Sequence, residues 1–242
     1  MNKLNKKYYI LISILVFILL LVVIFFIYVG NYYHADLEDV CVFSSEGAYK
    51  EVLDDNTIVY SSEGASTGII FYPGGKVEHL AYEPLVMECA KYGYLCAVVD
   101  MPFNLAVFDV DRASLVLDKY PEIENWYIGG HSLGGAMAAS YVSKNSDIFS
   151  GLILLGAYST SDLSKTSLKV ISIYGSEDKV LNMDKYNKNK KNLPSSFSEK
   201  VIPGGCHSNF GMYGKQSGDG KCLISNADQI RETMFLIYKY ID

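Results

Sequence analysis

The stretch Gly130-His131-Ser132-Leu133-Gly134 has the form G-x-S-x-G and is the strongest indicator of the fold in this sequence. It follows a short apolar run, Trp126-Tyr127-Ile128, and precedes a run of small helix formers, Ala136-Met137-Ala138-Ala139. This order predicts a strand, a sharp turn and a helix, with Ser132 at the top of the turn. Strand and helix pass so close on either side of such a turn that only glycine fits two residues before and two after the serine. The serine hydroxyl is then exposed at a helix N-terminus, where negative charge is stabilised.

Apolar runs and helical periodicity along the rest of the chain predict alternating strands and helices. We expect strands over residues 40–43, 57–60, 68–72, 94–99, 125–128, 152–155, 170–174 and 200–202, and helices over 78–92, 109–120, 133–144 and 228–241. The first two strands are expected to be antiparallel, and the later, fully apolar ones are typical of buried parallel strands. The prediction is an α/β fold with a mostly parallel central sheet and helices on both faces. Sites in such sheets form at the carboxyl ends of the strands.

The N-terminal segment predicts one membrane-spanning helix. Residues 8–29 contain no charged side chain, and about 20 apolar residues suffice to span a bilayer as a helix. Lys3, Lys6 and Lys7 precede this segment, and no acidic residue appears before Asp36, so the positive-inside rule orients the N-terminus toward the cytoplasm. We expect a cytoplasmic stretch over 1–7, a transmembrane helix over 8–29, a juxtamembrane linker over 30–36 and an extracytoplasmic domain over 37–242. A cleaved signal peptide is the main alternative, although no small-residue cleavage pattern follows the apolar core.

The charge balance of the chain argues against nucleic acid as a partner. The 242 residues include 21 basic and 27 acidic ones, which gives a formal charge of −6. Three basic residues and no acidic residue precede the apolar segment, so the remainder carries 18 basic against 27 acidic residues, a charge of −9. That balance disfavours both nucleic acid and an anionic lipid surface as partners of the domain. The oligomeric state stays open.

The five cysteines show no metal-binding spacing. No C-x-x-C or Cys/His zinc pattern occurs, so we expect no metal site. Cys206 and Cys222 flank a glycine-rich loop and are the best candidates for a disulfide, which an external location permits. Reduced, buried thiols are the alternative.

A serine nucleophile needs a base within hydrogen-bond reach and an acid that orients the base. The chain has four histidines, and only His207 follows the last predicted strand, as the order serine, acid, histidine requires. Asp178 follows the strand over 170–174 and is the preferred acid. Asp162 follows an earlier strand and is the main rival, whereas the neighbouring Glu177 is expected to point elsewhere.

An oxyanion hole needs two backbone donors aimed at the developing negative charge. The N–H of Leu133, directly after the serine, is one candidate. The loop Pro73-Gly74-Gly75-Lys76 follows the third predicted strand and supplies the other candidate. We prefer the Gly75 amide, with Lys76 as the alternative. Taken alone, an ordinary tight turn would explain these glycines equally well.

Residues 68 to 207 resemble the α/β-hydrolase superfamily, and most closely its compact group related to dienelactone hydrolases. The stretches Phe71–Gly75, Val99–Ala106, Gly129–Ala136 and Tyr174–Asp178, in this order, carry the resemblance. It implies Ser132 as nucleophile, Asp178 as acid and His207 as base. Dienelactone hydrolases themselves use a cysteine nucleophile, so their substrate is not carried over to this chain.

The segment from Gly156 to Leu168, between the strand over 152–155 and the acid-bearing strand, is too short for a cap domain. We therefore expect an open site, with residues 101–110 as one wall, for substrates that are bulky or presented at a surface. The favoured function is a serine esterase or lipase-like hydrolase that cleaves a small-molecule or lipid-like ester through an acyl-enzyme, without cofactor or metal. An acyltransferase or peptidase on the same triad is one alternative, because the fold does not fix the acyl acceptor. A non-catalytic binding scaffold is the other.

Overall fold

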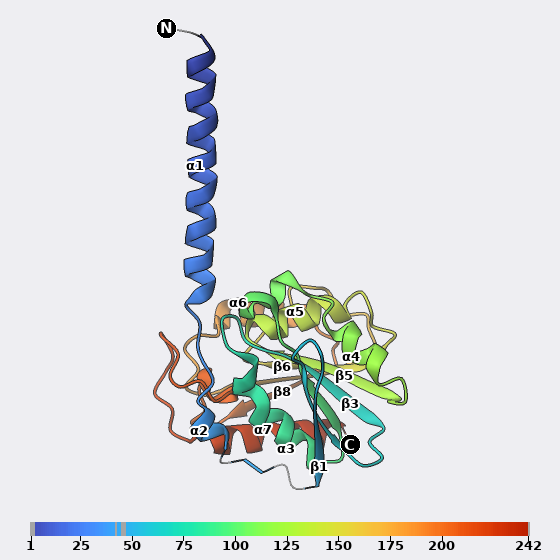
Figure 1. Cartoon of the computed structure of the whole chain (residues 1–242). Helices are drawn as coiled ribbons and strands as arrows, with labels where there is room; N and C mark the ends of the chain where they lie inside the picture. Colours follow the sequence, from blue (N-terminus) through green and yellow to red (C-terminus); the bar gives the residue numbers. More distant parts are fainter. Residues whose placement is uncertain (1–2, 42, 45–46, 242) are drawn as a thin grey trace. The chain divides into compact units, whose positions relative to one another are not determined.

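The computed structural model describes residues 3–41, 43–44 and 47–241 of the chain (Figure 1). It divides into two compact units, one ending at Tyr32 and one beginning at Tyr33. The first unit is helix α1 (Lys3–Gly30), whose segment from Lys6 to Gly30 has a mean hydropathy of 3.7. By length and composition this segment passes for a membrane span or for a signal sequence, and it contains the predicted span 8–29.

The second unit is built on one eight-stranded sheet with the order β1-β2-β4-β3-β5-β6-β7-β8. The six strands from β4 to β8 in this order are parallel, and β1 pairs antiparallel with β2 at one edge. The predicted antiparallel strand over 57–60 corresponds to β2, but its partner is β1 and not residues 40–43. The strands are β1 (Ala48–Val52), β2 (Ile58–Ser62), β3 (Thr67–Tyr72), β4 (Leu95–Val98), β5 (Asn125–His131), β6 (Phe149–Leu155), β7 (Lys169–Gly175) and β8 (Ser198–Ile202). The strand order reverses around β3, and ligand sites form at such switch points.

Helices cover both faces of the sheet, which confirms the predicted α/β fold (Figure 1). On one face, α3 (Glu83–Ala90) and α7 (Asn226–Ile241) bury Leu85 and Met234 against the strands. On the other face lie α4 (Ala113–Lys119), α5 (Leu133–Val142) and α6 (Met183–Asn189). Short 3-10 turns connect these elements: η1 (His79–Tyr82), η2 (Pro102–Asn104), η3 (Ala106–Phe108), η4 (Lys190–Asn192) and η5 (Ser208–Phe210).

The predicted strand over residues 40–43 is wrong. Residues Leu37–Val40 form a one-turn helix, α2, because the Asp36 carboxylate accepts the N–H groups of Glu38 and Asp39 and so caps a helical turn. Val40 and Phe43, three residues apart, are both buried on one side of the turn, which a strand would not allow. Residue 42 lies outside the described residues. The first strand is instead β1, a mostly exposed edge strand without an apolar run to reveal it.

Candidate active site

The turn after β5 holds Ser132 in a backbone conformation with positive φ. Ser132 has φ 52° and ψ −119°, a left-handed region that side-chain-bearing residues rarely adopt. The flanking glycines leave no room for a side chain: a Cβ on Gly130 would lie 2.6 Å from the Gly134 carbonyl carbon, and one on Gly134 would overlap the carbonyl oxygens of Tyr72 and Pro73. The turn is therefore the strand–serine–helix arrangement that the sequence predicts.

His207 and Asp178 form a buried pair at the neighbouring strand ends. Nδ1 of His207 lies 2.8 Å from Oδ2 of Asp178, and both side chains are 1% exposed. The other carboxylate oxygen of Asp178 accepts the N–H groups of Val180 and Leu181, at 2.9 and 2.8 Å. Nε2 of His207 is buried and has no hydrogen-bond partner within the described chain. A neutral histidine held in this way carries its proton on Nδ1 and keeps Nε2 as a proton acceptor.

Ser132 and His207 line the same pocket, which has a volume of about 360 Å³. Residues after β5, β6 and β7 complete its walls: Leu133, Ala136, Met137, Gly156, Ala157, Tyr158, Thr160, Val180, Leu181 and Asn182. The predicted wall over residues 101–110 is not among these lining residues, so that prediction is wrong for this pocket. The physical reason is that Asn104 turns toward the loop after β3, where its carbonyl accepts the Lys76 N–H at 2.7 Å.

The loop after β3 has a backbone amide, that of Gly75, for which the described part of the chain supplies no acceptor. The Gly74 N–H donates to the Tyr82 hydroxyl at 3.1 Å, and the Lys76 N–H donates to Asn104. No partner within the described chain takes up the Gly75 N–H or the Leu133 N–H. Gly75 also lies against Leu133, since a Cβ on Gly75 would come within 2.8 Å of Leu133 Cδ2. This arrangement favours the Gly75 amide over the Lys76 amide as the second backbone donor of a candidate oxyanion hole.

The rival acids lie elsewhere. Asp162 is exposed, and its carboxylate accepts the N–H of Ser164 in a local turn, which lowers the pKa of Asp162. Glu177 accepts the hydroxyl of its neighbour Ser176. Asp178 alone of the three is paired with His207.

The three other histidines have different neighbours. His34 is exposed near Glu78, and His79 lies 3.3 Å from the Asp100 carboxylate. His131 points into the protein, as predicted, with Nδ1 2.7 Å from the Tyr82 hydroxyl. Its ring centroid is 4.4 Å from that of His207. Burial, followed by the nearby His207, holds the pKa of His131 well below its usual range, so this ring is neutral beside the pair.

Two residues that contact the His207–Asp178 pair or its loop were not predicted from the sequence. Gly156, directly after β6, has φ 52°, and a Cβ there would lie 2.9 Å from His207 Nδ1 and 3.3 Å from Asp178 Oδ2. Its place after an apolar strand is the one signal that would have found it. The Asp219 carboxylate accepts the N–H groups of Ser208 and Gly220, both at 2.8 Å, and that of His207 at 3.3 Å. No sequence pattern marks Asp219.

Hydrogen bonds also determine the pKa of the Asp219 carboxyl group. Burial alone would raise the pKa of this carboxyl group, but the donors from Ser208, Gly220 and His207 outweigh burial and lower the pKa. Asp219 is therefore ionised wherever the protein is folded near neutral pH.

The structure contains two disulfides. Cys206, next to His207, is bonded to Cys222, which confirms the predicted pair. Cys89 at the end of α3 is bonded to Cys96 in β4, a pair that the sequence analysis did not propose. Within residues 3–41, 43–44 and 47–241, no three His, Cys, Asp or Glu side chains gather to hold a metal ion.

A model of the alpha/beta hydrolase family matches residues 68–231, and the chain therefore belongs to that family. Among solved structures, the chain is similar to one described as a predicted CIB-like hydrolase from Thermoplasma acidophilum. The TM-score is 0.57 at 17% identity, and the match covers 79% of this chain and 98% of that one. At this identity the likeness concerns the fold. No curated protein sequence matches the chain significantly. Family membership indicates a hydrolase.

Proposed function

We propose that this protein is a serine hydrolase that cleaves carboxylic esters, with Ser132 as nucleophile, His207 as base and Asp178 as orienting acid. The observation that carries the proposal is the His207–Asp178 pair, joined at 2.8 Å, whose Nε2 has no partner in the described chain and lies in the pocket that Ser132 lines. A buried, oriented histidine beside a serine on a strained turn is the arrangement that activates a hydroxyl.

In the proposed reaction, Ser132 Oγ attacks the ester carbonyl carbon while His207 Nε2 takes the hydroxyl proton. Asp178 stabilises the imidazolium, and the amides of Leu133 and Gly75 donate to the oxyanion. His207 then gives the proton to the leaving alcohol, and an acyl-Ser132 ester remains. Water attacks this ester as His207 takes the water proton, and collapse of the intermediate releases the carboxylic acid and restores Ser132.

We also propose that α1 is an uncleaved anchor and that the hydrolase unit faces the outside of the cell. Lys3, Lys6 and Lys7 before the span and the absence of acidic residues before Asp36 support this orientation. The two disulfides support it further, because disulfides persist in oxidising compartments. Protease added to intact cells should degrade the domain, and full protection would contradict the external placement.

A fluorophosphonate probe tests the proposed nucleophile, because it labels activated serines covalently. The full chain in detergent should be labelled and should hydrolyse p-nitrophenyl esters, and Ser132→Ala should abolish both. Labelling that persists in Ser132→Ala, or a wild-type chain that is never labelled, would contradict the proposal. Offering amide substrates and alcohol acceptors to the same preparation separates ester hydrolysis from peptidase and acyl-transfer activity.

The choice of acid has its own matched pair of variants. We expect Asp178→Asn to lower kcat by a factor on the order of 10³–10⁴, because the amide can no longer hold His207 in the required tautomer. Asp162→Asn, at the exposed rival position, should leave kcat unchanged. Steady-state ester hydrolysis measures both, and the reverse ranking would assign the acid to Asp162.

A further inference from the structure

Three exposed apolar side chains gather on the segment that follows β4. We call residues 101–110 the apolar loop. Phe103, Val107 and Phe108 on this loop are 45%, 46% and 51% exposed. The rings of Phe103 and Phe108 lie 5.6 Å apart, edge to face, so they form one patch. Contiguous apolar surface of this kind marks a site of interaction with a protein, a ligand or a membrane.

The apolar loop is bonded to the loop that carries the proposed oxyanion donor. The Asn104 carbonyl accepts the Lys76 N–H at 2.7 Å, and Lys76 follows Gly75 directly. Phe103 and Asn104 both have left-handed backbone conformations, with φ of 57° and 55°, which shape the loop at this contact. The apolar loop is therefore bonded to the residue after Gly75, although it does not line the pocket of Ser132 and His207.

The beginning of the second unit is bonded to the same loop. The Tyr33 N–H donates to the Lys76 carbonyl at 2.8 Å, and the Glu78 N–H donates to the Tyr33 carbonyl at 2.9 Å. Lys76 thus joins Tyr33 on one side and the apolar loop on the other. Helix α1 ends at Gly30, three residues before Tyr33. An extended chain spans at most about 3.6 Å per residue, so three residues reach no farther than about 11 Å.

This short covalent connection has a consequence if α1 spans a bilayer. Whatever the angle between the two units, the chain cannot carry Lys76 far from the end of the span. The loop that carries Gly75, and the apolar loop bonded to it, then stay within a short length of chain of the lipid surface. A longer linker would not set this limit on the distance between the site and the bilayer.

We propose that the apolar loop docks on the outer lipid surface and that the site takes its ester substrates from the bilayer, as acyl lipids. This inference rests on the proposed function. The contact is apolar rather than ionic, because the chain after the span carries a formal charge of −9, Asp109 lies within the loop and Asp111 follows it directly. Neutral lipids are therefore favoured over anionic ones.

The first test compares two esters of the same fluorogenic alcohol in one preparation of the full chain. The chain is reconstituted in phosphatidylcholine vesicles and given 4-methylumbelliferyl butyrate in the water or 4-methylumbelliferyl oleate in the bilayer. In Val107→Ser/Phe108→Ser, the ratio of oleate to butyrate hydrolysis should fall at least about tenfold, because two large apolar contacts with lipid are lost. Phe103 is left in place because its left-handed backbone makes any replacement there ambiguous.

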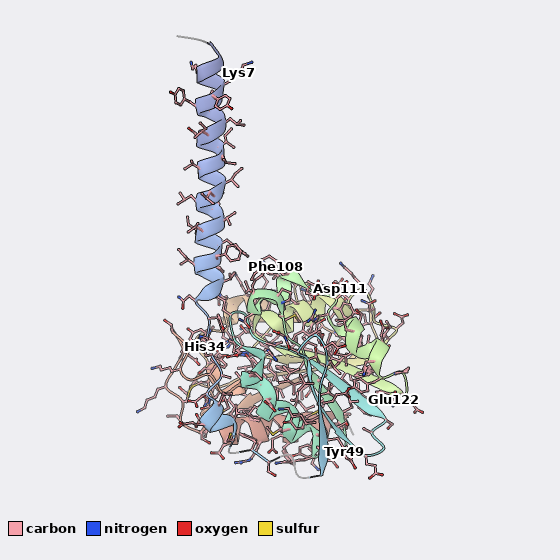
Figure 2. The ribbon with its side chains drawn as sticks, viewed as in Figure 1. Lys7, His34, Tyr49, Phe108, Asp111 and Glu122 are labelled. Carbon is pink, nitrogen blue, oxygen red and sulfur yellow. A yellow bond between two sulfur atoms is a disulfide. The ribbon has the colours of Figure 1, made fainter. Side chains whose placement is uncertain are left out.

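The control removes similar apolar surface elsewhere in the same unit. Tyr49 and Val52 on the edge strand β1 are 66% and 56% exposed, and Figure 2 shows Tyr49 at the opposite end of the second unit from Phe108. Tyr49→Ser/Val52→Ser should leave the ratio unchanged. An equal ratio in wild type and Val107→Ser/Phe108→Ser, or an equal fall in both variants, would overturn the inference.

A second measurement needs no activity and so separates this inference from the proposed function. Phe108→Trp and Tyr49→Trp are compared in vesicles of phosphatidylcholine brominated along the acyl chain, with the buried native Trp126 as common background. Quenching at position 108 but not at 49 supports docking, and equal quenching at both overturns it. A chain that quenches at 108 but hydrolyses neither ester and takes no fluorophosphonate contradicts the proposed function alone.

Discussion

Ser132 and His207 reach the same pocket, but the protein holds them by different means. Ser132 is fixed by backbone: its N–H donates to the Leu155 carbonyl at 2.9 Å, and Gly130 and Gly134 pack without space for a side chain. His207 lies on a loop without regular structure beyond one short turn. That loop is held from outside by Asp219 and by the disulfide between Cys206 and Cys222.

The two halves of the site should therefore respond differently to substitution. The serine turn is packed directly against backbone atoms. One methyl group added at Gly130 or Gly134 would therefore force backbone segments apart. The histidine loop depends on several separate contacts, so the loss of one should shift His207 by degrees. Substitutions in the serine turn should therefore chiefly lower the free energy of unfolding. Substitutions around the histidine loop should also lower kcat by a graded amount.

The largest effect on stability is expected at Gly134. A Cβ there would overlap the carbonyl oxygens of Tyr72 and Pro73, which belong to the central strand β3 and the turn after it. Gly134→Ala should lower the free energy of unfolding by more than about 3 kcal/mol, because backbone on both sides must shift. Thermal unfolding of the full chain in detergent should show a drop in Tm of roughly 6–12 °C.

Gly218 supplies the matched control for that substitution. Its φ is +84°, and a Cβ there would meet no atom within 4 Å. Gly218→Ala should cost about 1 kcal/mol, the strain of a left-handed backbone alone. If the two alanine variants were equally stable, steric closure of the serine turn would not be what holds Ser132.

The next effect is expected at Gly156, which follows β6 directly and lies against the His207–Asp178 pair. A Cβ would press on His207 Nδ1 and Asp178 Oδ2. Gly156→Ala should lower kcat by about 100-fold, since a displacement near 1 Å of a catalytic group has that effect. Near-normal ester turnover would show that the His207–Asp178 pair tolerates displacement, and would contradict the view that β6 positions it.

A smaller effect is expected at Asp219. Asp219→Ala leaves the N–H groups of His207, Ser208 and Gly220 without their acceptor, which should cost about 1–3 kcal/mol of stability. We expect kcat to fall about tenfold while KM stays constant, because one of several contacts on the loop is lost. Asp228→Ala, which removes an exposed acceptor of the Ser225 hydroxyl, is the control and should change neither kcat nor KM.

The same contrast explains what the sequence could predict. The serine side is local, so five consecutive residues and the apolar runs around them reveal strand, turn and helix. His207 and Asp178 were found from their places after strands, because the parallel sheet brings strand ends together. Asp219 lies 12 residues from His207, in a loop without periodicity, so only the folded chain shows their contact. The strand predicted over 40–43 failed because the Asp36 cap outweighed a short apolar run.

The smallest effect concerns His131, which belongs to the serine turn but faces His207. Burial holds the pKa of His131 well below its usual range, so the folded protein keeps it neutral, whereas the unfolded chain takes up a proton below about pH 6.5. The unfolded state then binds more protons, and stability is lost as the pH falls below 6.5, by up to about 1.4 kcal/mol per pH unit.

His131→Asn should remove that part of the pH dependence while retaining an acceptor for the Tyr82 hydroxyl. The measurement is the free energy of unfolding of the full chain in urea and detergent at pH 7 and pH 5. His34→Asn, at an exposed histidine, should keep the wild-type slope. His131→Asn can also change the stability at both pH values. The prediction therefore concerns only the difference between the free energies of unfolding at pH 7 and at pH 5. An unchanged difference would mean that His131 accepts a proton in the folded state as readily as in the unfolded chain, which would contradict a neutral His131 beside the His207–Asp178 pair.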